Sequence, residues 1–135
     1  DGIRDSLGLV GSEMCIRDSA YTVSQSSTSP DGFSKSLKVD ITATDTSLVG
    51  NNYSQVSYQL ERQDVRSFAY GGSNAKPITL SFYVRSNKTG NYNVNILQYG
   101  NSTRLASFTY TINSANTWER KSTKFSWYFI CSTKG

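Results

Sequence analysis

Aromatic and amide side chains are the residues of this chain best suited to do chemistry, because they are numerous and recur along it. The chain has nine tyrosines and two tryptophans in 135 residues. Sugar rings present apolar C–H faces, so a carbohydrate site combines an aromatic platform with Asn, Gln or Arg donors. We expect such a surface on the outward positions of strands, at Tyr83, Tyr99, Trp118, Arg85, Asn93 and Asn95. The alternative is that most of these aromatic side chains lie in the core or at sheet edges.

Catalysis and metal binding have little support in the sequence. The chain has no histidine, which removes the commonest general base and metal ligand. Glu61 and Asp64 are close in sequence, but paired catalytic carboxylates need a cleft and a defined separation. The simpler interpretation is that Glu61 ends a strand and Asp64 caps a helical turn. A structural calcium site at Asp31, Asp40 or Asp45 is conceivable, although no Asp-x-Asp spacing supports it. We therefore expect no enzyme and no cofactor.

The charge balance is basic but dispersed. The formal charge is +4, and beyond residue 19 twelve lysines and arginines face six carboxylates, a balance of +6. This excess favours anionic surfaces, yet no dense basic run or nucleic-acid module is present, so we expect no nucleic-acid partner. No apolar run approaches the length of about 18 residues that spans a bilayer, which predicts no membrane insertion. Two cysteines, Cys15 and Cys131, fix no disulfide framework.

The first nineteen residues differ in character from the rest. Ile-Arg-Asp-Ser occurs at 3–6 and at 16–19 without a periodic apolar face, so it is no structural repeat. Residues 9–19 resemble the conceptual translation of a transposase-end sequencing adapter. Charged residues interrupt every apolar stretch, which excludes a signal peptide. We predict that residues 1–19 are non-native and disordered; a genuine but poorly ordered N-terminus is the alternative.

Strands dominate the predicted secondary structure. Residues 78–85 alternate apolar and polar side chains, with Leu80 and Phe82 facing a core. The same alternation at 36–42 points Leu37, Val39 and Ile41 inward. A strand is also predicted at 54–61, where Val56, Tyr58 and Leu60 share a face. Further strands are predicted at 92–99, 104–112 and 118–125. A turn at 29–32, a helical turn near 63–70 and a hairpin-like connection at 87–91 complete the pattern.

These elements predict an all-β fold, an antiparallel β-sandwich or jelly roll. We expect a single domain over 20–135. Residues 127–131 abandon the alternation, which leaves 126–135 doubtful and predicts a domain truncated at its C-terminus.

A set of short segments occurs in order between residues 36 and 121: SLKV at 36–39, TDTSL at 44–48, LE at 60–61, QDV at 63–65, AK at 75–76, TLSFYV at 79–84, SNKTGNY at 86–92 and NTWERK at 116–121. With these segments, residues 36–121 resemble the carbohydrate-binding-module-like jelly-roll domains found in tail and other virion proteins of phages that infect marine bacteria. The family usually has glycine where Arg62 stands, and it continues past Phe125 with a Gly- and Asp-rich loop.

The resemblance implies a non-enzymatic component of the virion, exposed on the tail or particle surface. Its implied partners are a cell-surface glycan and other virion proteins, with a homotrimer as one assembly. The resemblance assigns no ligand residue. Two alternatives remain open: a purely structural spacer domain of a phage fibre, and a carbohydrate-binding appendage of a secreted bacterial glycoside hydrolase.

Overall fold

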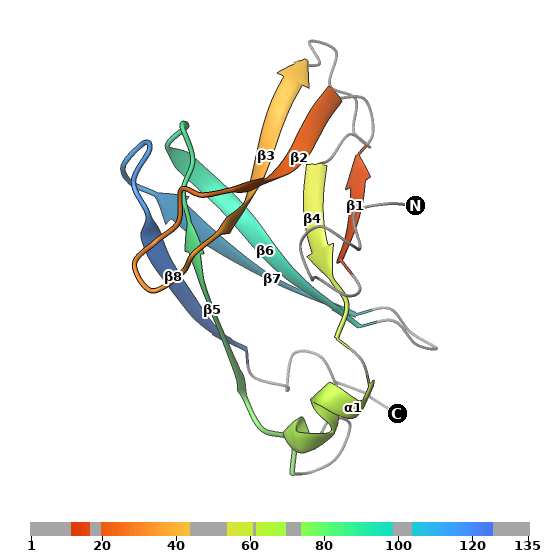
Figure 1. Ribbon diagram of the computed structural model, residues 1–135. Coiled ribbons are helices and arrows are strands. Elements are labelled where there is room, and N and C mark those ends of the chain that lie inside the picture. The colour runs from red at the N-terminus through yellow and green to blue at the C-terminus, as the bar shows by residue number, and fades with distance from the viewer. Residues whose placement is uncertain are drawn as a thin grey trace. The chain divides into compact units, whose positions relative to one another are not determined.

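The structure is a computed structural model that describes residues 12–16, 20–43, 54–60, 62–69, 74–98 and 104–125. In these ranges the chain is mostly β-strand, each strand pairs antiparallel with one other, and one short helical turn interrupts the strands (Figure 1). The predicted all-β, antiparallel fold of the sandwich type is confirmed, whereas the jelly-roll topology stays a prediction. None of the helical segments in the described ranges has the length and apolarity to cross a bilayer.

The chain divides into two compact units, residues 1–61 and 62–135. The single domain expected over residues 20–135 stays a prediction.

The first unit contains two ladders of two strands each. β1 (Ser12–Ile16) pairs with β4 (Ser54–Tyr58), and β2 (Ala20–Ser26) pairs with β3 (Ser36–Ala43). The prediction of disorder over residues 1–19 is not what the structure shows for β1, whose five residues pair in register with β4. The adapter origin of that segment stays a prediction.

The turn between β2 and β3 follows directly from its sequence. The Phe33 amide donates to the Pro30 carbonyl at 3.1 Å, and Gly32 at the third turn position has φ 87°. A type II turn requires a positive φ at that position, which glycine adopts without steric cost. The turn predicted at 29–32 is therefore confirmed.

The apolar side chains of the first unit are more exposed than the alternation predicts. Leu37 is half-buried, but Ile41 is 60% exposed and Val56 53% exposed. Val39, Tyr58 and Leu60 are exposed as well. A two-stranded ladder covers little area, and its apolar face becomes buried only under a second layer.

The second unit begins with the predicted helical turn. α1 (Arg62–Val65) continues into a 3₁₀ turn at Arg66–Phe68, which ends at Ala69 with a left-handed φ of 52°. Asp64 lies inside α1 as its third residue and not at its cap, because the helix begins earlier than the sequence suggested. Glu61 lies outside the described residues.

Four strands follow the helical turn: β5 (Ile78–Val84), β6 (Gly90–Gln98), β7 (Arg104–Ile112) and β8 (Glu119–Phe125). β5 pairs with β8, and β6 pairs with β7. The connection at 87–91 is therefore not a hairpin, since the strands on either side of it pair with different partners. Residues 78–125 form one long hairpin in which both arms bend, through residues 85–89 in one arm and 113–118 in the other.

Aromatic contacts hold the two ladders of this unit face to face. The Phe82 ring of β5 meets the Tyr110 ring of β7 edge-on at 5.2 Å between centroids, and Tyr92 of β6 stacks on Tyr110 at 5.8 Å. Burial, together with the nearby Tyr92 hydroxyl, raises the pKa of Tyr110. We call this side of each ladder its inner face. The predicted inward positions of Leu80 and Phe82 are confirmed as half-buried, while Ser81 between them is exposed.

The two bends in the arms lie side by side and are bonded to each other. The connection at 113–118 has one residue more than that at 85–89, and Asn116 in it adopts a left-handed φ of 59°. The Asn116 amide donates to the Ser86 carbonyl at 2.7 Å, and Arg85 Nε donates to the Asn116 carbonyl at 2.8 Å. Ile112, at the start of this connection, is the most buried apolar residue among those described, with 1% exposed.

We expect Phe82→Ala to lower the free energy of unfolding by about 2 kcal/mol, because the ring is partly buried and carries the contact with Tyr110. Tyr83→Ala is the matched control: it removes a ring of similar size from the opposite face of the same strand and should cost less than about 1 kcal/mol. Urea unfolding followed by circular dichroism measures both. Equal losses would mean that the two faces of β5 are not distinguished by packing.

Candidate functional site

The predicted site residues do not lie on one surface. Tyr83 is 41% exposed on the outer face of β5, and Asn93 and Asn95 are exposed on the outer face of β6. The inner faces of these strands meet through Phe82 and Tyr110. Tyr83 and the two asparagines therefore face away from each other, on opposite sides of the two-layer unit, and cannot contact the same small ligand.

The other predicted residues are placed less simply. Trp118 is half-buried, and its indole Nε1 is buried without a hydrogen-bond partner among the described residues, so it does not form the exposed platform that was expected. Arg85 is exposed, as predicted, although its Nε is engaged by the Asn116 carbonyl. Tyr99 lies outside the described residues.

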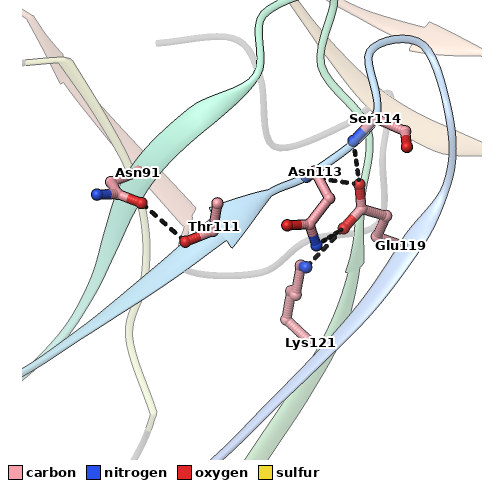
Figure 2. Close-up of polar contacts among 6 residues, drawn as sticks. All are labelled: Asn91, Thr111, Asn113, Ser114, Glu119 and Lys121. Carbon is pink, nitrogen blue, oxygen red and sulfur yellow. Dashed lines mark hydrogen bonds and ion pairs between the residues drawn. The ribbon is translucent and has the colours of Figure 1, made fainter.

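The outer face of β6 and β7 is polar and neutral over residues 91–95 and 107–111, and beyond them the exposed Leu97 lies opposite the exposed Leu105. Thr109 Oγ1 donates to Asn93 Oδ1 at 2.7 Å. Thr111 Oγ1 donates to Asn91 Oδ1 at the same distance (Figure 2). Each bond joins two residues that are directly opposite in the register, so the ladder is internally satisfied through its amide oxygens. Its described outer positions carry no aromatic ring, and this face lacks the platform that a sugar needs.

The outer face of β5 and β8 combines an aromatic ring with cations. In the register Tyr83 lies opposite Arg120, Ser81 opposite Ser122, and Thr79 opposite Lys124. All of these positions are exposed, and Arg85 continues the outward series at the end of β5. We call this set the basic face: Thr79, Ser81, Tyr83, Arg85, Arg120, Ser122 and Lys124.

Sequence reasoning missed Arg120 and Lys124 because β8 is polar on both of its faces. Glu119, Lys121 and Thr123 occupy inner positions, and Arg120, Ser122 and Lys124 occupy outer positions. Because the strand is polar on both sides, its sequence does not show which of its residues face outward. The pairing of β8 with β5 shows that Arg120, Ser122 and Lys124 do.

A carboxylate beside the basic face is neutralised internally. Glu119 Oε1 accepts from the amides of Asn113 at 2.9 Å and Ser114 at 2.8 Å, while Oε2 accepts from Lys121 Nζ at 2.6 Å (Figure 2). The hydrogen bond from Lys121 and those from the two amides lower the pKa of Glu119 from 4.5 to about 2. The carboxylate thus anchors the start of the 113–118 connection and leaves the basic face without an opposing charge.

Comparisons of the chain with protein families, with curated proteins and with solved structures gave no match. Within the described ranges, no three His, Cys, Asp or Glu side chains gather into a group that could hold a metal ion. The outer side of β5 and β8 presents an exposed phenol ring, hydroxyl groups and a guanidinium group on paired strands.

We expect Glu119→Gln to lower the melting temperature at pH 7 by several degrees, because the amide cannot accept from Lys121 as a carboxylate does and directs an N–H group at other donors. The folded-state pKa lies below the unfolded value, so this stability is present above about pH 4.5 and is lost as the pH falls toward 2.

The measurement is thermal unfolding of both proteins between pH 2 and pH 7. The gap in melting temperature should be constant from pH 5 to 7 and close between pH 4.5 and 2. A gap of constant size over the whole range would contradict the anchoring role of the charged form. Asp40→Asn, which removes a half-exposed carboxylate that pairs with Lys38 at 2.6 Å, is the control and should change little.

Proposed function

We propose that this chain is a non-catalytic β-sandwich module that binds carbohydrate on the surface of a host cell, as part of a virion tail fibre or a similar particle component. The observation that carries the binding proposal is Tyr83, a ring 41% exposed on a paired strand with Arg120 directly opposite. The virion setting is supported by the resemblance of residues 36–121 to phage tail domains.

The physical case rests on how sugars are recognised. A pyranose stacks its C–H face on an aromatic ring and presents hydroxyl groups at its rim, which need donors and acceptors within reach. On the basic face the guanidinium of Arg120 and the hydroxyls of Ser81 and Ser122 surround the Tyr83 position on the two strands. Since these residues lie on strands and not on loops, their backbone loses little conformational freedom when a ligand binds.

The lack of a catalytic set among the described residues is compatible with this proposal but does not carry it. Asp64 and Glu119 are the described carboxylates of the second unit. Asp64 belongs to α1, and Glu119 is held by Lys121 and two amides on the inner side of β8. Glu119 is thus engaged in structure, and it is not placed on the face that carries Tyr83.

We expect a glycan array probed with the purified chain to give binding that Tyr83→Ala weakens by at least tenfold, because the variant removes the stacking surface. Asn95→Ala is the matched control: it alters an exposed polar position on the opposite outer face and should leave binding unchanged. Circular dichroism of both variants verifies that they remain folded. If no glycan binds, and Tyr83→Ala changes only stability, the chain is a structural spacer.

The virion setting is tested separately, by sequencing the surrounding locus in one uninterrupted read. We expect capsid and tail genes on either side. A catalytic domain in the same reading frame would instead assign the module to a secreted glycoside hydrolase.

A further inference from the structure

Charge is divided very unequally between the two units of the chain. Residues 62–135 contain ten lysines and arginines against two carboxylates, a formal charge of +8. Residues 1–61 contain four against eight, a formal charge of −4. The overall value of +4 therefore conceals a strongly basic unit, and such asymmetry within a chain indicates an anionic partner for the basic part.

The basic face carries three of these ten cations where a ligand can reach them. Arg85, Arg120 and Lys124 are all exposed on or beside the outer side of the β5–β8 ladder, and no carboxylate shares that side among the described residues. Glu119, adjacent to Arg120 in sequence, points to the inner side and is bonded to Lys121 at 2.6 Å. The cations of the basic face therefore have no internal counter-charge on their own surface.

From this we infer that the basic face binds an acidic polysaccharide, one that carries carboxylate or sulfate groups along a chain of sugars. The inference rests on the proposed function and specifies its ligand class. Tyr83 would stack on a sugar ring, while the guanidinium of Arg120 takes an acidic group in a bidentate hydrogen bond, a geometry that lysine does not offer.

The spacing of the cations favours a polysaccharide over a nucleic acid. Arg120 and Lys124 lie on the same side of β8, four residues apart, and are therefore separated by about 13 Å along the strand. Ser122 and Ser81 occupy the interval between them with hydroxyl groups. Nucleic-acid strands carry one phosphate about every 3.4 Å of duplex axis, far denser than these cations, whereas an acidic polysaccharide alternates charged groups with neutral hydroxyls.

The experiment titrates the full chain by calorimetry with four probes: alginate oligosaccharides, a sulfated dextran, unmodified dextran and single-stranded oligothymidylate. We expect the two acidic glycans to bind, with affinity falling several-fold between 50 and 200 mM NaCl, and dextran to bind at least tenfold more weakly. The double variant Arg120→Gln/Lys124→Gln should weaken acidic-glycan binding by at least tenfold.

Two matched variants control for net charge and for folding. Lys76→Gln/Lys88→Gln removes the same charge from exposed positions of the second unit that lie off the basic face, and should leave binding within twofold. Arg120→Lys/Lys124→Arg keeps the charge and should retain binding to within about fivefold. Urea unfolding establishes that each variant folds.

The outcomes separate this inference from the function on which it depends. Neutral-glycan binding that needs Tyr83 and survives Arg120→Gln/Lys124→Gln would overturn the acidic ligand and keep the carbohydrate module. Oligothymidylate binding as tight as alginate, with the same dependence on Arg120 and Lys124, would make the face a nucleic-acid site. If Arg120→Gln/Lys124→Gln and Lys76→Gln/Lys88→Gln weaken binding equally, the effect is one of net charge and the inference is overturned. If no glycan binds, both proposals are overturned.

Discussion

The contact between the two ladders of the second unit is the constraint on which the site depends. Phe82 meets Tyr110 edge-on at 5.2 Å, and Tyr92 stacks on Tyr110 from the neighbouring strand. Once these rings are enclosed between two layers, period-two alternation assigns every other residue to one of two outer faces. A shift of β5 by one residue would move Tyr83 inward and bring Phe82 to the surface.

The bends of the long hairpin determine how the two layers are joined. The 113–118 connection has one residue more than its neighbour, and that excess is taken up where Asn116 adopts a left-handed backbone. Backbone and side-chain hydrogen bonds then link Asn116 to Ser86 and Arg85. Glu119 secures the start of the same connection through two amides. Polar groups on the inner side of β8 are tolerated because each charge there has donors or acceptors within bonding distance.

The two outer faces created in this way differ in chemistry. The β6–β7 side is neutral: Asn and Thr side chains are bonded to one another, as at Asn93 and Thr109, and an exposed leucine pair continues the face. The β5–β8 side carries an exposed ring and cations in a unit whose formal charge is +8. Of these two faces, as far as their residues are described, the β5–β8 side combines a ring for stacking with positive charge, and the carbohydrate proposal and the acidic-ligand inference therefore converge on Tyr83 and Arg120.

The sequence by itself determined the β character of the chain and several of its elements. Alternation located β3 and β7 almost to the residue, Pro30-Asp31-Gly32 marked a turn, and the segment before Gly71 formed a helical turn. These signals are local, because alternation and turn propensities act between residues near in the chain. Strand β2, rich in Ser and Thr, gave no such signal, although it pairs along its whole length with β3.

Tertiary structure alone decided which strands are neighbours. Backbone hydrogen bonds between strands are the same for every sequence, so alternation shows which side chains face inward and not which strand lies beside them. The pairing of β5 with β8, in place of the expected hairpin with β6, set Arg120 opposite Tyr83. The same packing places Asn93 and Asn95 on the side of the unit opposite to Tyr83, because two layers in contact have outer faces that point in opposite directions.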